Sequence, residues 1–318
     1  MKSFSRPLIE DSAIESFLTK CLDINSIADR YKLNVYNQEA IEEISTKIRD
    51  VEAAVANTDS RDTLDNKSCR RGTYRDDGIR DSLRRRIVSE LIEGERLDCD
   101  DDIALGKGGA KPRNISPVAN RQAYFFTGLP ASGKSSLVNR TADILGAYIL
   151  DSDFAKRKLP EYSSPAGANL VHREASKIVF GGSKAAPCLS KFCIFNGFNI
   201  VLPKVGSDYD ELIEEREALR NQGYSVHLTT TIIPRQLATF RAFRRFEQTG
   251  RYVPLSLVFD GYANDPNLTY YRAMTETLLG GDAGWASLAA VCTLESQPKL
   301  IGKHGKDNPA EFLDGGSK

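Results

Sequence analysis

The sequence predicts an α/β protein in which a mostly parallel sheet, flanked by helices, follows a small α-helical domain. Three observations support this fold class. From residue 123 onward, short apolar runs alternate with helical patterns, which is typical of parallel strands joined by helices. A glycine-rich loop connects the first apolar run to a helix. Residues 1–95 show only a helical spacing of apolar side chains.

Composition favours a soluble globular protein. The chain has 318 residues, a length that suggests two domains. The formal net charge is +0 and the pI is near 6.8, which argues against a membrane-surface protein and makes nucleic acid an improbable partner. No apolar run approaches the ~20 residues that cross a bilayer, and the first residues lack the apolar core of a signal peptide. Six scattered cysteines without a C-x-x-C spacing fit a reduced, cytoplasmic protein.

We expect a helical domain at residues 1–95, a linker at 96–119 and the α/β domain at 120–318. Residues 36–55 carry one apolar stripe, formed by Ile41, Ile44, Ile48, Val51 and Val55. A second stripe is expected between residues 73 and 93, formed by Ile79, Leu83, Ile87 and Leu91. The linker is polar and glycine-rich, and its aspartates at 98–102 are interpreted as a solvated turn because they lack the spacing of a calcium loop.

Arginines mark the other face of the second helix, at Arg80, Arg84, Arg85 and Arg86. The simplest interpretation is a solvated helix face. The alternative is a contact with an acidic partner or with nucleotide phosphates. The helical residues contain no catalytic constellation.

Residues 128–135 read G-x-x-x-x-G-K-S, between the apolar run 124–126 and a helical pattern. This is the phosphate-binding loop of P-loop NTPases in its strand–loop–helix context. Its glycines allow torsions that turn backbone N–H groups toward phosphates at the positive end of the helix. We expect Lys134 to reach the terminal phosphates of ATP and Ser135 to ligate Mg²⁺. The predicted nucleotide-binding residues are Gly128, Ser132, Gly133, Lys134, Ser135 and Ser136.

Further strands are expected at residues 147–150, 200–202, 224–233 and 288–294, and Pro234 opens a helix. Ligands of such sheets bind at the carboxyl ends of the strands, where the phosphate loop and Asp151-Ser152-Asp153 both fall. Asp153 is the candidate base for an acceptor hydroxyl, and Asp151 is the alternative base, a ligand of Mg²⁺ or water, or a substrate-binding residue. Both aspartates could instead serve only as helix caps.

Basic residues that could neutralise phosphate charge follow Pro234. Arg241, Arg244 and Arg245 lie on that helix, and Arg251 comes just after it. Guanidinium groups can hold phosphate oxygens bidentately. Because Phe240, Phe243 and Phe246 supply a buried face, these arginines are interpreted as more than a solvated surface. His172 is not assigned, since a lone histidine is more often structural.

The motifs from about residue 123 to 254 resemble the zeta toxins, P-loop kinases of toxin–antitoxin systems. The resemblance rests on the phosphate loop, on Asp151-Ser152-Asp153, on the turn Leu159-Pro160-Glu161-Tyr162, and on Arg245-Phe246-Glu247. It implies that Asp153 is the catalytic base, that Glu174 contacts the substrate, and that Arg245 and Arg251 bind phosphate. Characterised members of the family phosphorylate UDP-N-acetylglucosamine, and a related plant-pathogen effector phosphorylates NAD.

One departure from the family concerns the end of the third strand. The family carries an acidic residue, glycine and threonine there and holds the sugar with them, whereas this chain has Pro203-Lys204-Val205-Gly206. A site without those polar groups selects differently among acceptors. Lys204 is therefore a candidate substrate-binding residue for an acceptor with more phosphate, and a Lys204→Ala variant with unchanged acceptor affinity would remove this hypothesis.

Three functions are compatible with the sequence. The favoured one is a small-molecule kinase of zeta-toxin type, with ATP and Mg²⁺ as cofactors. The second is a P-loop kinase of another acceptor, such as NAD, a nucleic-acid end or a protein. The third is a nucleotide-gated binding module. The resemblance also implies an antitoxin partner. Their order and helicity suggest that the N-terminal helices could inhibit in cis, and deleting residues 1–115 should then raise toxicity or ATP affinity; the alternative is a helical extension that only packs against the kinase domain.

Overall fold

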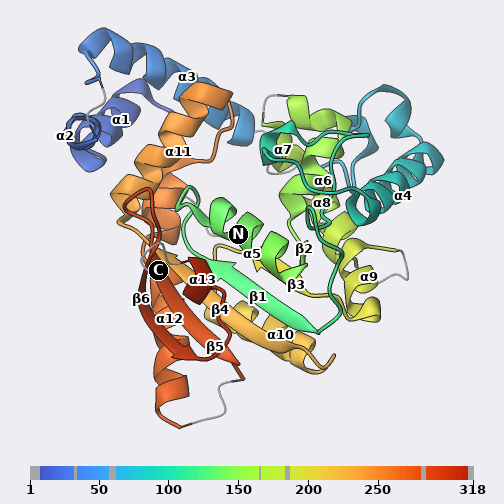
Figure 1. Cartoon of the computed structure of the whole chain (residues 1–318). Helices are drawn as coiled ribbons and strands as arrows, with labels where there is room; N and C mark the ends of the chain where they lie inside the picture. The colour runs from blue at the N-terminus through green and yellow to red at the C-terminus, as the bar shows by residue number, and fades with distance from the viewer. Residues whose placement is uncertain are drawn as a thin grey trace.

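A six-stranded sheet forms the centre of the molecule (Figure 1), in the order β2-β3-β1-β4-β5-β6. The computed structural model describes residues 8–31, 34–56, 62–164, 166–182, 187–280 and 284–313. Five strands are parallel, and β6 runs antiparallel to β5. The strands are β1 (Gln122–Thr127), β2 (Tyr148–Ile149), β3 (Ile200–Pro203), β4 (Ser225–Ile232), β5 (Ser287–Cys292) and β6 (Lys299–Gly305).

The chain alternates between strands and helices across this sheet, which confirms the predicted fold class. The connections from β1 to β2 and from β4 to β5 cross the sheet in opposite directions, so right-handed crossovers place their helices on opposite faces. The helices of this part are α5 (Lys134–Leu145), α6 (Ser152–Lys158), α7 (Gly167–Leu170), α8 (His172–Phe180), α9 (Leu189–Asn196), α10 (Tyr209–Arg220), α11 (Arg235–Thr249), α12 (Asp265–Leu278) and α13 (Ala310–Leu313). Among the described residues, no helix is long and apolar enough to cross a membrane.

The central strands of the sheet are buried along almost their whole length. Every residue of β1 from Ala123 to Thr127 is buried, and so are residues 226–231 of β4. Central parallel strands are covered on both faces, so they lack the alternation of a half-exposed strand. The edge strand β6 is the exception, since it is mostly exposed.

The first helices pack onto α11 rather than onto the sheet. They are α1 (Asp11–Ser16), the π-helical turn η1 (Phe17–Cys21), α2 (Ile24–Arg30) and α3 (Gln38–Ala56). Their apolar side chains form one buried cluster with Phe240 and Phe243 of α11, and with Phe259 of the turn η6 (Leu257–Tyr262). Figure 1 shows these helices (blue) above α11 (orange), away from α4. The aromatic face predicted for α11 is therefore the docking surface of the N-terminal helices.

Helix α4 (Asp77–Glu93) lies elsewhere, against α6, α8 and α9. Its buried stripe contains Leu83, Ile87 and Leu91 as predicted, but Ile79 is 44% exposed and Arg80 is fully buried in its place. The interpretation of Arg80 as part of a solvated face is thus wrong, whereas Arg85 and Arg86 are exposed. Two buried carboxylates account for this, because they hold the Arg80 guanidinium in the interior.

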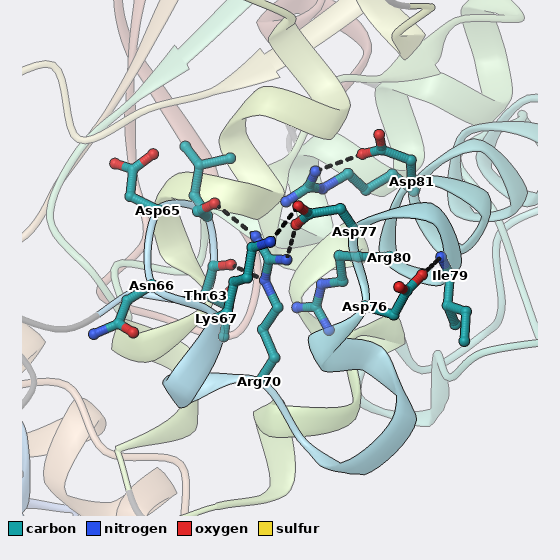
Figure 2. Close-up of polar contacts among 12 residues, drawn as sticks. Thr63, Asp65, Asn66, Lys67, Arg70, Asp76, Asp77, Ile79, Arg80 and Asp81 are labelled. Carbon is teal, nitrogen blue, oxygen red and sulfur yellow. Dashed lines mark hydrogen bonds and ion pairs between the residues drawn. The ribbon is translucent and has the colours of Figure 1, made fainter.

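A compact turn-rich segment leads into α4 (Figure 2). It contains the 3₁₀ turns η2 (Lys67–Cys69) and η3 (Gly72–Arg75). The buried Arg70 donates to the carbonyl oxygens of Thr63 and Leu64, and it pairs with Asp77. Asp76 caps α4 by accepting from the backbone N–H of Ile79. This segment therefore has a defined structure of short turns between α3 and α4.

Residues 96–119 are bound to the sheet domain along their length. Arg96 is 2% exposed and donates to the side-chain and backbone oxygens of Asn139 on α5. Arg113 pairs with Asp143 of the same helix. Lys158 of α6 donates to the carbonyl oxygens of Ala104 and Lys107. The division at 95 and 119 stays a prediction, but residues 96–113 are held in place.

Candidate active site

The phosphate loop lies at the carboxyl end of β1, where its geometry requires glycine. Gly128 has φ +140°, and a Cβ there would lie 2.1 Å from Thr231 Oγ1. Gly133 has φ +87° and immediately precedes α5. Both torsions lie in the region that L side chains rarely adopt. The loop can therefore approach a phosphate closely while the first N–H groups of α5 remain unpaired within the helix.

Lys134, the first residue of α5, folds back over this loop. Its Nζ donates to the carbonyl oxygens of Gly128 and Leu129, both at 2.6 Å. Burial lowers the pKa of Lys134 to about 7, with nearby Arg245 adding to the effect and Asp151 opposing it. A bound phosphate would offset this loss of solvation, so the site is arranged to take up an anion.

Two threonines, Thr231 and Thr293, support the loop from the neighbouring strands, and the sequence analysis did not identify them. Thr231 of β4 forms a 2.6 Å hydrogen bond with Ser132 Oγ and donates to the carbonyl oxygen of Thr127. Thr293, just after β5, donates to the carbonyl oxygen of Ser132 at 2.5 Å. The β-branched run of β4 was predicted as a strand. The threonine at its carboxyl end, Thr231, could have been recognised from the sequence as a possible partner of the phosphate loop.

The predicted carboxylates follow β2 and begin α6. Asp151 caps that helix, since its Oδ1 accepts from the backbone N–H of Asp153 at 2.8 Å. Burial raises the pKa of Asp151 to about 6, and the neighbouring charge of Asp153 adds to this. Burial also opposes the charge of Asp153, but Lys156 and Arg251 outweigh it and hold the pKa of Asp153 well below its usual range. Asp153 is therefore ionised, and it is the carboxylate that is paired with two cationic side chains, Lys156 and Arg251.

Basic side chains from two elements converge on Asp153. Lys156 lies 2.8 Å from its Oδ1, and Arg251, from the segment after α11, pairs with its Oδ2. Arg245 lies near Arg251 and Asp153. Burial is the main cause that lowers the pKa of Arg245; the charge of Arg251 lowers it further, and the charge of Asp153 opposes the change. The buried Nε of Arg245 has no hydrogen-bond partner within the part of the chain that the structure describes. The structure thus brings together Lys134, Asp151, Asp153, Arg245 and Arg251.

The other two arginines of α11 have structural contacts. Arg241 donates to the carbonyl oxygens of Thr293 and Leu294, which ties α11 to the segment after β5. Arg244 donates to the Tyr36 hydroxyl, and both contact Glu247. Arg244 therefore links α11 to the N-terminal helices and does not face the phosphate loop.

Glu174, a predicted substrate residue, is fully buried under α4. Its carboxylate accepts from Arg80 at 2.7 and 2.6 Å and from Arg84 at 2.7 Å. Glu161 completes the cluster with two 3.0 Å bonds from Arg80. Burial opposes the charge of Glu174, but Arg80 outweighs it and lowers the pKa. In this structure α4 occupies the face of Glu174 that a substrate would need.

Lys204, the other predicted substrate residue, lies beside the phosphate loop but turns away from it. Its Nζ pairs with Glu215 of α10 and lies 5.2 Å from the centre of the Phe180 ring. A cavity of about 450 Å³ borders Phe180 and extends along α8 past Lys177 to His172. Burial lowers the pKa of His172, Lys156 adds to this and Asp153 opposes it, so this end of the cavity lies near the carboxylate.

The residues present fit ATP and Mg²⁺. Only glycine fits the first position of the loop, because a Cβ at Gly128 would collide with Thr231, and the buried Arg245 Nε has no partner among the described residues. Ser135 is exposed at the start of α5, and Ser136 Oγ donates to the Gly133 carbonyl oxygen. In the described residues no three acidic, histidine or cysteine side chains gather to hold a metal. Mg²⁺ would thus be held by Ser135 and phosphate oxygens, the hard ligands that it prefers.

This sheet and this loop define a P-loop protein with a kinase-type fold. Residues 108–264 match the family model described as Zeta toxin, the family that the motifs of this part of the chain resemble. No curated protein matches the sequence.

Similar solved structures have low sequence identity. A structure from the PezAT chromosomal toxin–antitoxin system of Streptococcus pneumoniae has 14% identity and a TM-score of 0.48, over 77% of this chain and 88% of that chain. The AvrRxo1-ORF1:-ORF2 complex has 16% identity and a TM-score of 0.44, over 78% and 73%. A gluconokinase from Sinorhizobium meliloti 1021 has 18% identity and a TM-score of 0.30, over 55% and 84%.

Proposed function

We propose that this protein is an ATP-dependent kinase that transfers the γ-phosphate to a hydroxyl of a nucleotide-sugar or a similar nucleotide metabolite. Its zeta toxin domain supports this function, and with it a role as the toxin of a toxin–antitoxin-type system in the cytoplasm. The single observation that carries the proposal is the position of Asp153. It is an ionised carboxylate between Lys156 and Arg251 in the first turn of α6. Nucleotide binding alone has no need of it.

Each charged group has a role in this proposal. Lys134 and Arg245 would hold the terminal phosphates, and Ser135 would hold Mg²⁺. Bound ATP would supply the phosphoryl group, and Mg²⁺ would neutralise its charge. The anion would draw Arg251 from Asp153, which raises the proton affinity of the carboxylate at the moment when the acceptor hydroxyl must lose its proton.

The acceptor is proposed to enter along α8. The cavity there has space for a small molecule, and Arg173, Lys177 and Phe180 offer cationic and aromatic contacts. Lys204 pairs with Glu215 beside Phe180, so an acceptor phosphate would have to compete with that ion pair. NAD and UDP-N-acetylglucosamine both carry a diphosphate, so both are tested as acceptors.

Phosphoryl transfer from labelled ATP tests the proposal. The purified protein is incubated with UDP-N-acetylglucosamine, with NAD, or with a metabolite extract, and labelled products are separated. A labelled small molecule that is absent with Asp153→Asn identifies the acceptor class. Label in a nucleic-acid end or in protein would support the second kind of kinase instead. ATP binding with no transfer to any acceptor would contradict the proposal and favour a nucleotide-gated binding module.

A contact between the N-terminal helices and the phosphate loop favours an alternative candidate function, a nucleotide-gated binding module. Ile27 of α2 packs against an apolar cluster that contains Leu129 of the phosphate loop. Ala131 of the loop packs in turn against the larger cluster of the N-terminal helices. A nucleotide that changes the conformation of the loop would therefore change the contact between the loop and α2. The same contact fits inhibition in cis, and a separate antitoxin would have to dock around these helices.

A further inference from the structure

An acidic turn before the zeta toxin domain inserts a carboxylate among the basic residues of the candidate site. Asp101 lies in the 3₁₀ turn η4 (Asp100–Asp102), outside the matched residues 108–264. Its Oδ1 accepts from Arg157 Nη2 at 2.7 Å and from Arg251 Nη1 at 3.2 Å. Arg245 also acts on the charge of Asp101. One carboxylate oxygen thus bridges two arginines of an arginine cluster, Arg157, Arg245 and Arg251.

This position is fixed on both sides of Asp101. Asp100 accepts from the Asn139 side chain of α5 at 3.3 Å, and Ile103 is 3% exposed in the main core. Lys158 holds the carbonyl oxygen of Ala104 at 2.9 Å. The carboxylate is therefore placed by its backbone, and it is not a surface side chain that meets an arginine by chance.

The arginine cluster needs an anion and has too few carboxylates. Arg157 is 3% exposed at its side chain, and its other bond goes to the backbone oxygen of Asp153. Arg251 divides its two terminal nitrogens between Asp101 and Asp153. Arg245 has a buried Nε with no partner among the described residues. A tetrahedral phosphate offers several oxygens to such a cluster, where Asp101 offers one shared oxygen.

We propose that Asp101 occupies the position of a phosphoryl group in the nucleotide-free protein, and that the γ-phosphate of ATP displaces it from Arg157 and Arg251. The inference rests on the proposed function, because it takes the arginine cluster as the site of the terminal phosphate. Asp101 is 44% exposed at its side chain, so it can turn into solvent without breaking the core contact of Ile103. The turn that bears Asp101 would then lower the affinity of the protein for a nucleoside triphosphate.

Calorimetric titration of full-length protein with Mg²⁺ and either ADP or a non-hydrolysable ATP analogue tests this role. Asp101→Asn keeps the size of the side chain and removes the competing charge. We expect the triphosphate analogue to bind about tenfold more tightly to this variant, because a charge-assisted contact no longer has to be given up. ADP, which lacks the γ-phosphate, should bind with little change.

Asp102→Asn is the matched control, since Asp102 is exposed on the same turn and makes no ion pair among the described residues. Its affinity for both nucleotides should equal that of the unaltered chain. Equal or weaker triphosphate binding by Asp101→Asn overturns the role of Asp101 and leaves the proposed kinase standing. If neither protein binds either nucleotide, the proposed function fails, and this inference with it.

Discussion

At the scale of the residue, the candidate site is defined by ionisable groups with displaced pKa values. Burial lowers the pKa of Lys134 to about 7 and raises that of Asp151 to about 6. Lys134 therefore holds its proton weakly in the folded protein, and a phosphate nearby must raise its pKa again. Because the unfolded chain keeps that proton up to a much higher pH, Lys134 costs stability below pH 7, and this cost is lost as the pH rises.

This displacement makes nucleotide binding dependent on protons. At pH 8 most free protein should carry a neutral Lys134, so binding of ATP should take up about one proton. Calorimetric titrations in buffers of different ionisation enthalpy measure that number directly. Asp151 is ionised at this pH and should contribute nothing. Lys134→Met should abolish the uptake and weaken binding; proton release by the unaltered chain would contradict the assignment.

Arg80 is the residue on which the attachment of α4 depends most. Removing it takes the Arg80 guanidinium from the buried Glu161 and leaves Glu174 with Arg84 alone of its two arginine partners, and breaking a buried ion pair typically costs about 3–5 kcal/mol. We expect Arg80→Met to lower the free energy of unfolding by this amount in urea denaturation at neutral pH. The deficit should shrink as the pH falls through the lowered pKa of Glu174 and that carboxyl becomes neutral.

The matched control is Arg85→Met, which changes an exposed arginine on the same helix. It should alter the free energy of unfolding by no more than about 0.5 kcal/mol. A loss at Arg80 no larger than that at Arg85 would show that the buried cluster does not hold α4.

At the scale of the element, the contact between α2 and the phosphate loop gives the test of inhibition in cis. Ile27→Ala trims the side chain that packs against the cluster of Leu129 and leaves the buried Ile24 and Ala28 in place. If the N-terminal helices restrain the loop, the variant should bind ATP several-fold more tightly, with a small loss of stability from the lost methylenes. Fluorescence titration with a labelled nucleotide would show this.

Two results bear on that interpretation. Asp29→Ala changes an exposed position on α2 and should leave ATP affinity unchanged. Weaker binding by Ile27→Ala would mean that α2 supports the nucleotide site and does not restrain it. Either measurement avoids deleting residues 1–115, which would also remove Arg96 and Arg113 from α5.

Elements with a strong local signal could be predicted from the sequence. The phosphate loop needs glycine at two positive φ angles, and β4 and α11 carry their own β-branched and aromatic patterns. The face of α4 could not be predicted fully, because Arg80 is buried only by virtue of carboxylates about ninety residues away. The same reason applies to Asp101 and Arg157, whose contact joins the presumed linker to α6. Strand β6 was missed because it is mostly polar and exposed.

At the scale of the whole molecule, the residues before the phosphate loop approach the candidate site from two sides. The helices α1–α3 dock on α11, and Glu52 of α3 contacts the Tyr252 hydroxyl next to Arg251. Helix α4 and the Asp101 turn cover α6 and α8 on the other side (Figure 1). A change at either contact should therefore alter the position of Arg251, which lies between Tyr252 and Asp101.

The central claim is that Asp153 performs chemistry that nucleotide binding does not require. The most direct test compares ATP affinity and single-turnover phosphoryl transfer in the unaltered chain and in Asp153→Asn, with the acceptor found in the extract. The account predicts that transfer falls by roughly 10²- to 10⁴-fold while ATP still binds. Transfer at an undiminished rate in Asp153→Asn would contradict it.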